Sequence, residues 1–239
     1  HSDRILRENN EKMRQEFTAN VSHELKTPLT SISGYAELIE TGIAKPEDTP
    51  GFARKIHVEA SRMIQLVNDI LQLSHLDNVS ETGAAPAMET VDLLDVAREC
   101  VERQKVNARH SYISLTYLGE SAPVTGSRVL LDELCQNLCD NAIRYNRPGG
   151  KVQIITACTR DGHCTLTVKD NGIGIPKEAQ TSVFERFYRV DKSRSKATGG
   201  TGLGLAIVKH IARIHNARIK LDSVVDEGTT ITVIFETAS

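Results

Sequence analysis

Apolar residues recur every three or four positions in two stretches near the start of the chain. The first stretch lies between Phe17 and Ile39, and the second lies between Phe52 and Leu73. The segment between them contains Gly42 and the run AKPEDTPG, which ends a helix and forms a turn. The pattern therefore predicts a helical hairpin. Because one hairpin cannot bury both apolar stripes well, we expect two copies to form a four-helix bundle.

Beyond a predicted linker of small and polar residues at 79–90, helical and strand-like segments alternate. This interleaving favours an α/β sandwich over a doubly wound parallel sheet. The predicted organisation is a helical domain at 1–78, the linker, and an α/β domain at 91–239. In that domain we expect helices at 92–109, 130–146 and 202–215, a hairpin at 151–170 that turns at Asp161-Gly162, and further strands at 113–118, 218–224 and 229–236.

Composition and charge narrow the class of protein. Hydrophobic residues make up 39% of the 239 residues and aromatic residues only 4%, so we expect an aliphatic core. The 29 basic and 31 acidic side chains argue against a general nucleic-acid binder, which usually carries a basic excess. No apolar run approaches the roughly 18 residues of a membrane span. The polar start of the sequence is unlike a signal peptide, and without a capping signal it is typical of a fragment of a longer helix.

The five cysteines cannot all pair within one chain, and none has the spacing of a zinc site. Cys135 and Cys139 lie four residues apart in a helical pattern, and Cys158 and Cys164 flank a turn. We expect all of them to be reduced and mostly buried thiols of a cytosolic protein.

His23 is the first residue with distinctive chemistry. At about 100° per residue it lies about 200° from Val21, so it projects away from the apolar stripe. Glu24 is its neighbour, and Thr27 lies one turn further along the same exposed face. Pro28 follows and should bend the helix, because it lacks an N–H group. Taken alone, an exposed histidine is more often an ordinary surface residue.

Two glycine-rich runs indicate a nucleotide site. In the first, DNGIGIP, Asp170 ends a strand on the face shared by Leu166 and Val168. A buried carboxylate needs a donor, such as the amino group of a heterocycle. The second run, GGTGLGL, opens a helix whose N–H groups would attract phosphate. It lacks the features of a Walker A loop or a dinucleotide fingerprint. Either run alone could form ordinary turns, but together they favour a nucleotide.

Two further features belong to this region. Asn137 and Asn141 lie on one helical face, where their amide oxygens suit Mg²⁺ or serve only as surface or capping groups. Between the glycine runs, Phe184 and Phe187 are expected to anchor a segment on the domain surface. The polar, basic stretch after Tyr188 is either a mobile lid over phosphates or an ordinary solvated loop.

The ordered motifs resemble those of the sensor histidine kinases of bacterial two-component systems. FTANVSHELKTPLTSISGYAEL resembles their H-box, NLCDNAIRYN their N-box, DNGIGIP their G1 box, VFERFYRVD their F-box and GGTGLGLAI their G2 box. The resemblance covers nearly the whole chain. It implies a HisKA-type dimerisation and phosphotransfer hairpin followed by an ATP-binding domain with the Bergerat fold of the GHKL ATPases.

The resemblance also implies roles for residues. His23 would be phosphorylated from ATP and pass the phosphoryl group to an Asp of a response regulator, with Glu24 as proton acceptor. Thr27 would orient water for a reverse phosphatase activity. Asp170 would accept the adenine amino group, and Asn141 and Asn137 would hold Mg²⁺. The remaining nucleotide-binding residues implied are Arg144, Tyr145, Gly172, Gly174, Arg189, Gly200, Thr201, Gly202, Leu203 and Gly204.

Two positions carry further information. Arg144 stands where the N-box usually has Lys, which keeps the charge but changes the geometry. Asn137 stands where related ATPases have a Glu that activates water. An amide cannot act as that base, so direct ATP hydrolysis should be slow.

The expected partners are a second copy of the chain and a response regulator, with no nucleic acid. The expected location is the cytoplasmic side of a bacterial membrane receptor, attached through segments outside this sequence. Two alternatives remain: a dimeric signalling scaffold without catalysis, and a phosphatase-dominant regulator with weak kinase activity. A Ser/Thr kinase of the related anti-sigma type is disfavoured, because that type lacks the hairpin that carries the histidine.

Overall fold

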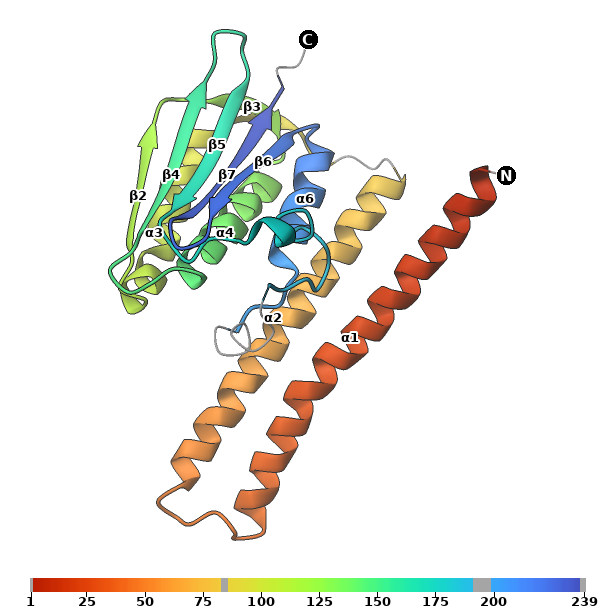
Figure 1. The fold of residues 1–239 in the computed structure, drawn as a ribbon, viewed down its shortest axis with the longest axis vertical. Coiled ribbons are helices and arrows are strands. Elements are labelled where there is room, and N and C mark those ends of the chain that lie inside the picture. The colour runs from red at the N-terminus through yellow and green to blue at the C-terminus, as the bar shows by residue number, and fades with distance from the viewer. Residues whose placement is uncertain (1, 83–85, 191–198, 237–239) are drawn as a thin grey trace. The chain divides into compact units, whose positions relative to one another are not determined.

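The computed structural model describes residues 2–82, 86–190 and 199–236 (Figure 1). Contacts within the chain divide it into two compact units, His1–Ile70 and Leu71–Ser239. Over the described ranges, no helix combines the length and the apolar character that crossing a bilayer requires.

The first unit contains the predicted helical hairpin. Helix α1 spans Ser2–Glu40, and α2 spans Thr49–Thr82, so that its last turns belong to the second unit. The turn between them places Gly42 at a positive φ of 70°. The helices meet near this turn, where the rings of Tyr35 and Phe52 lie 5.7 Å apart between centroids. α1 continues through Pro28, and α2 continues into residues that the sequence predicts as linker.

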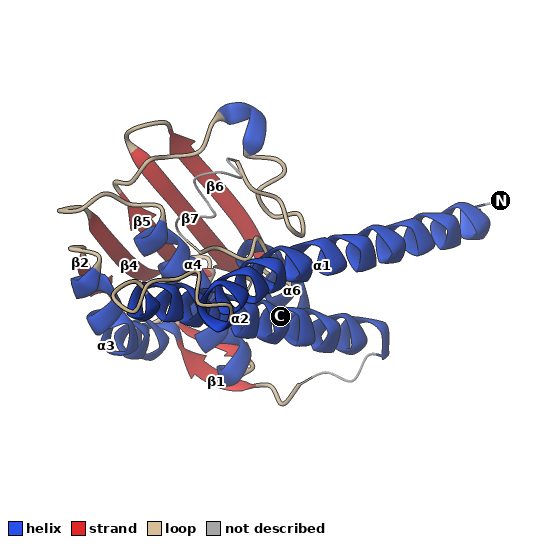
Figure 2. Cartoon of the chain, turned by 90° about the horizontal axis from the view of Figure 1, so that it is seen from below, coloured by secondary structure: helices blue, strands red, loops and turns tan. Residues whose placement is uncertain are grey.

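The second unit is the predicted α/β sandwich. Its five-stranded sheet has the order β2-β4-β5-β7-β6, in which β2 and β4 are parallel and the other neighbours are antiparallel. Three helices, α3, α4 and α6, cover one face of this sheet (Figure 2). The strands are β2 Ser114–Gly119, β4 Lys151–Cys158, β5 Cys164–Asp170, β6 Arg218–Val224 and β7 Gly228–Phe235. The helices are α3 Leu93–His110, α4 Arg128–Arg144, the short η1 Lys177–Ala179, and α6 Gly204–Ile214.

The core lies between the sheet and these helices and is aliphatic, as predicted. Alternate residues of the central strands are buried because successive side chains of a strand point to opposite faces. Each buried aliphatic side chain contributes about 1.5–3 kcal/mol. Fully or nearly fully buried members include Val152, Ile154, Leu166, Val168 and Val233 from the strands, and Leu131, Leu134, Leu138, Ile207 and Ile211 from the helices.

A second, two-stranded sheet is absent from the sequence prediction. β1 Glu89–Asp92 pairs antiparallel with β3 Pro123–Gly126, so β1 begins inside the predicted linker. Asp92 then caps α3: its carboxylate accepts hydrogen bonds from the backbone N–H of Leu94 at 2.9 Å and of Ala122 at 2.8 Å. The same side chain therefore caps the helix and holds the residue that precedes β3.

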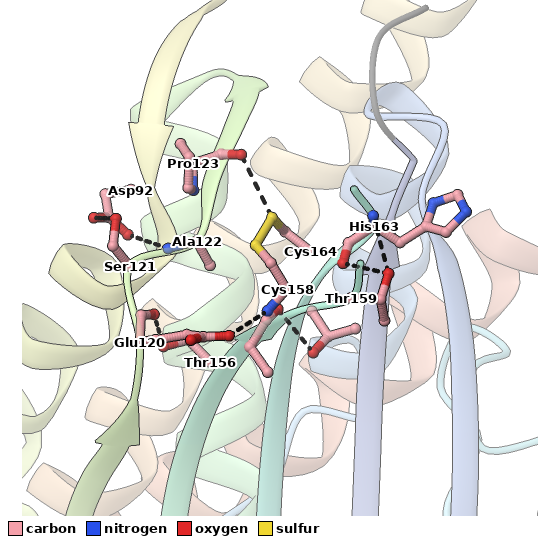
Figure 3. Close-up of a disulfide and its surroundings, with 12 residues drawn as sticks. Asp92, Glu120, Ser121, Ala122, Pro123, Thr156, Cys158, Thr159, His163 and Cys164 are labelled. Carbon is pink, nitrogen blue, oxygen red and sulfur yellow. Dashed lines mark hydrogen bonds between the residues drawn. A yellow bond between two sulfur atoms is a disulfide. The ribbon is translucent and has the colours of Figure 1, made fainter. Parts of the chain in front are cut away.

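The prediction that every cysteine is reduced is wrong for two of the five. Cys158 and Cys164 form a disulfide across the β4–β5 hairpin (Figure 3). They are register partners on the two strands, with Cα atoms 4.1 Å apart, so strand pairing alone brings their sulfur atoms together. The other three, Cys100, Cys135 and Cys139, are free and buried between α3 and α4, as predicted.

His215 connects the ends of two helices. Its Nε2 accepts a hydrogen bond from the backbone N–H of Ser127 at 3.0 Å, at the start of α4. Because Nε2 is the acceptor, the ring proton is on Nδ1, which donates to the carbonyl of Ile211 at 2.7 Å. A Cβ at Gly126 would lie 2.8 Å from the imidazole, so this approach requires glycine. The neutral ring is the form that fits, and burial lowers the pKa of His215 below 6.5.

We predict that His215→Ala lowers the free energy of unfolding by about 1–3 kcal/mol, because the Ser127 N–H group is left without its acceptor. The stabilisation is complete above the unfolded pKa of 6.5 and is lost as the pH falls through the lower folded value. Urea unfolding at pH 7.5 and 5.5 measures both effects. His110→Ala, on an exposed residue, is the control. The stability difference between wild type and His215→Ala should be smaller at pH 5.5 than at pH 7.5. An equal difference at both pH values would contradict the assignment of a neutral, buried His215.

Candidate functional site

Asp170 lies at the end of β5, next to the start of β7. Its Oδ1 accepts hydrogen bonds from the backbone N–H of Gly172 at 2.8 Å and of Thr229 at 3.3 Å. Burial raises the pKa of Asp170 to about 6, although these two hydrogen bonds act in the opposite direction. In the described parts of the chain, both bonds go to the same oxygen. Asp170 is thus a largely buried carboxylate that one more donor would stabilise.

The loop after Asp170 is built from glycine because backbone from two other elements crowds it. A Cβ at Gly172 would lie 2.4 Å from the carbonyl oxygen of Tyr145 and 2.9 Å from Oδ1 of Asp170. Gly174 has a positive φ of 69°, and a Cβ there would lie 2.1 Å from the carbonyl oxygen of Val224. The loop is thereby held against the end of α4, beside the Asp170 carboxylate.

The structure brings the two predicted metal ligands together. Asn137 and Asn141 lie one turn apart on α4. A Cβ at Gly204, the first residue of α6, would lie 3.1 Å from Oδ1 of Asn137 and 3.9 Å from Oδ1 of Asn141. The Nδ2 group of Asn137 donates to the carbonyl of Glu133 at 3.0 Å, which directs Oδ1 to the other side. Two amide oxygens therefore converge near the N-terminus of α6, as hard ligands for a divalent cation would.

Arg144 and Tyr145 end α4 next to the second glycine run. A Cβ at Gly200 would lie 3.0 Å from Oη of Tyr145, and one at Gly199 would lie 3.6 Å from Nη1 of Arg144. The guanidinium also donates to the Asp140 carboxylate at 2.7 Å. This ion pair orients a positive charge beside the glycine loop.

Hydrogen bonds to its carbonyl groups hold the second glycine run to the segment before it. Nη2 of Arg189 donates to the carbonyl of Gly200 at 2.6 Å, and the N–H of Phe187 donates to the carbonyl of Gly202 at 2.9 Å. Gly202 has a positive φ of 76°, and Phe187 one of 62°. Thr201 and Leu203 are buried. Phe184 and Phe187 are half-buried, while the core of the predicted lid, 191–198, lies outside the described residues.

One cluster of charged side chains in the second unit could not be predicted from the sequence. Nη2 of Arg186 lies 2.8 and 2.9 Å from the two carboxylate oxygens of Asp77, near the end of α2. Nδ1 of His210 on α6 lies 3.6 Å from Oδ1 of Asp77. Burial lowers the pKa of His210, although the Asp77 charge acts in the opposite direction. The cluster joins the end of α2 to the segment that carries Phe187.

His23 projects from α1 in the first unit, with 81% of its side chain exposed. Its Nδ1 lies 3.9 Å from Oε1 of Glu24, which is beyond hydrogen-bond distance but within the range of an ion pair. Oγ1 of Thr27 donates to the carbonyl of His23 at 3.2 Å, one helical turn away. The nitrogen facing away from Glu24 is Nε2, and it is open to an incoming group.

Known families match both units. The His Kinase A (phospho-acceptor) domain matches residues 13–79, and the Histidine kinase-, DNA gyrase B-, and HSP90-like ATPase matches residues 126–239. The mycobacterial sensor histidine kinase MprB has 32% sequence identity and a TM-score of 0.54, and the match covers 62% of this chain and 97% of that one. The chain belongs to the sensor histidine kinases. Its ATPase domain binds ATP.

Two other relatives define the extent of the likeness. The sensor-like histidine kinase SenX3 of Mycolicibacterium smegmatis is 44% identical over 228 residues, or 93% of this chain and 57% of that protein. The chain thus spans little more than half of this relative. Histidine kinase ThkA, solved in complex with response regulator protein TrrA, has a TM-score of 0.74 and 22% identity, over 97% of this chain and 64% of that one. At that identity it supports the two-part kinase fold alone.

We predict that Asp170→Asn weakens ATP binding but stabilises the protein without nucleotide. With Asp170 in its expected role as acceptor for the adenine amino group, losing that acceptor should cost about 1–3 kcal/mol of binding, or roughly 5- to 150-fold in Kd. The pKa of the Asp170 carboxyl is about 6 in the folded protein and 3.8 in the unfolded chain. Ionisation of the wild-type side chain therefore lowers the free energy of unfolding as the pH rises from 3.8 through about 6. The variant should therefore unfold at a higher temperature at pH 8.

Calorimetry with ATP and GTP, and melting curves at pH 8, measure these effects. Wild type should prefer ATP, because guanine lacks that amino group. Asp161→Asn, in the exposed β4–β5 turn, is the matched control. Equal affinity of wild type for ATP and GTP would show that Asp170 does not recognise adenine.

Proposed function

We propose that the chain is the kinase core of a cytoplasmic sensor histidine kinase. It transfers the γ-phosphoryl group of ATP to His23, passes the group to an Asp of a response regulator, and removes it again as a phosphatase. The proposed division is a dimerisation and phosphotransfer domain at 1–78, a linker at 79–90 and a catalytic ATP-binding domain at 91–239. Segments outside this sequence would attach the protein to the membrane.

The convergence of Asp170, the two asparagine amides and the glycine-rich start of α6 carries this proposal. The half-satisfied carboxylate at the end of β5 suits a heterocycle amino group. The Asn137 and Asn141 oxygens, near the Arg144 side chain, suit the phosphate end. Gly172, Gly174 and Gly202 would line the pocket, together with Gly200, Thr201, Leu203, Gly204, Tyr145 and Arg189.

The asparagine amides fit a hard divalent cation. Asn141 and Asn137 would hold Mg²⁺ through their Oδ1 atoms, and the cation would neutralise charge on the phosphates. Water would be a poor acceptor of the phosphoryl group here, because neutral Asn137 cannot take a proton from it. Arg144 is kept beside the loop by Asp140 and would add positive charge near the phosphate oxygens.

His23 is the proposed nucleophile. In a neutral imidazole one nitrogen carries a lone pair and the other carries a proton. Since Nδ1 faces Glu24, Nε2 would attack the γ-phosphorus. The N–P bond forms while the bond between phosphorus and the ADP oxygen breaks. Glu24 would take the Nδ1 proton as positive charge develops on the ring. Positioning and charge neutralisation would supply most of the rate.

A homodimer through the helical hairpin is part of the proposal. Large apolar side chains of α1 and α2 are exposed in the single chain, with Leu29 51%, Val58 58% and Ile64 63% accessible. A second hairpin would cover such residues in a four-helix bundle. The complex of ThkA with a response regulator supports a partner of that class for His23.

We predict that His23→Ala abolishes acid-labile phosphorylation by labelled ATP and leaves ATP affinity within about 2-fold of wild type. The two effects should separate because His23 and Asp170 belong to different units. His57→Ala, on the exposed surface of α2, is the control and should keep full labelling. Acid-labile phosphate on the His23→Ala protein would identify a different acceptor.

Thr27 and Glu24 should separate the two activities. Thr27→Ala should keep most autophosphorylation and lose most phosphatase activity, because its hydroxyl can hold a water in line with phosphorus but cannot take a proton. Glu24→Ala should slow autophosphorylation first, by about 100-fold, because the developing imidazolium loses its proton acceptor.

Both rates must be measured on both variants with the same phosphorylated regulator. Equal loss of the two activities in Thr27→Ala would mean that its hydrogen bond to the His23 carbonyl supports the helix instead.

A further inference from the structure

The disulfide lies at the end of the sheet opposite the nucleotide site. Cys164 is the first residue of β5 and Asp170 is the last, so the two ends of this strand are about 20 Å apart. The bridge joins β4 to β5 next to the segment that connects β2 with β3 (Figure 3). Chemistry at this pair is therefore spatially separated from the carboxylate that recognises the base.

Strand pairing keeps the two cysteines together independently of the bond between them. The turn around Gly162 is closed by the backbone N–H of Thr159, which donates to the carbonyl of His163 at 2.8 Å. Cys158 and Cys164 form the next pair, where strand backbones approach most closely. The ladder continues from there to the pair of Val152 and Asp170. Two thiols at these positions would remain neighbours, ready to form the bond again.

The surroundings also accommodate the reduced form. Sγ of Cys164 lies 3.6 Å from the carbonyl oxygen of Pro123. A sulfur in a disulfide has no proton, whereas a thiol at this place can donate S–H to that carbonyl. The N–H of Cys158 donates to Oε1 of Glu120 at 3.2 Å, a contact that does not involve sulfur. Each oxidation state therefore has suitable partners without movement of the strands.

Access distinguishes this pair from the other cysteines. Cys158 is half-buried, so this side of the pair is partly accessible to solvent, while Cys164 is 5% exposed. Cys100, Cys135 and Cys139 lie between α3 and α4 with at most 2% exposure. A reagent in solution will therefore react with the hairpin pair before it reaches the helix thiols.

We propose that Cys158 and Cys164 form a reversible redox site, reduced by dithiols and oxidised by low-molecular-weight disulfides, that sets the stability of the α/β unit without altering nucleotide affinity. In reduction, a dithiol thiolate attacks the Cys158 sulfur and the S–S bond to Cys164 breaks. Cys164 leaves as a thiolate and takes a proton. The second thiol of the reductant then displaces Cys158, so two electrons and two protons pass from the dithiol to the pair.

Thiol counting tests the site directly. In denaturant without reductant, the wild-type chain should show three thiols, because two of the five cysteines are paired; after dithiothreitol it should show five. Exposure of the native, reduced protein to oxidised glutathione, a low-molecular-weight disulfide, should return the count to three. Five thiols after that treatment would overturn the proposal.

Melting curves test the consequence. Reduction breaks the bond that closes a short loop in the unfolded chain, and it should lower the melting temperature by about 5 °C. Cys158→Ser should melt at one temperature with or without dithiothreitol, whereas Cys135→Ala retains the pair and should keep the shift. The Kd for ATP should agree within about 2-fold between oxidised and reduced wild type.

The proposed effect on stability would be contradicted if the melting temperature of wild type did not change with dithiothreitol. A Kd for ATP that changed with dithiothreitol would contradict the proposed independence of nucleotide affinity. Neither thiol counting nor melting requires kinase activity. If His23 proved not to be phosphorylated, the test of the Cys158–Cys164 redox site would still be valid. If the redox site failed its test, the proposed phosphorylation of His23 would be unaffected.

Discussion

The burial of one carboxylate is the main constraint on the candidate nucleotide site in the second unit. Asp170 ends the central strand β5, where burial raises its pKa to about 6 in spite of two backbone hydrogen bonds. Keeping the Asp170 carboxylate ionised in the folded protein at neutral pH costs free energy. Burial of the surrounding aliphatic side chains must offset this cost. Its position is fixed by strand pairing on both sides, with Val152 on β4 and Thr229 on β7 as register partners. A ligand that offers a donor to this group recovers part of that free energy as affinity.

The two proposed chemical tasks require opposite degrees of burial. Recognition of a base is strongest where water is excluded, and Asp170 meets that requirement within the sheet. A histidine with the role proposed for His23 would instead have to meet a nucleotide and then a second protein, and the His23 side chain is 81% exposed on a helix. Placing these groups in separate units allows both conditions to hold in one chain. Within the second unit, the contact of His215 with Ser127 links the end of α6 to the start of α4.

Much of this could be predicted from the sequence, because the signals are local. Apolar periodicity identifies the hairpin helices and the sandwich elements, and five ordered motifs indicate the family. The features that the sequence misses depend on pairing between distant or short segments. Strands β1 and β3 have four residues each, too few for a visible alternation. The contact between Asp77 and Arg186 joins residues 109 positions apart. The bond between Cys158 and Cys164 follows from strand register, which composition and compartment do not reveal. The roles of His23, Asn141 and the other site residues remain predictions.

The most direct measurement for the central claim is the titration of the Asp170 carboxyl carbon by NMR, without nucleotide and with a non-hydrolysable ATP analogue. We predict a pKa of about 6 for this carboxyl group in the free protein. Saturation with the analogue should lower it, because an adenine amino donor stabilises the ionised form. Asp170→Asn identifies the resonance. A pKa near the ordinary 3.8 in the free protein, or a value that the analogue leaves unchanged, would contradict the proposed role of this carboxylate.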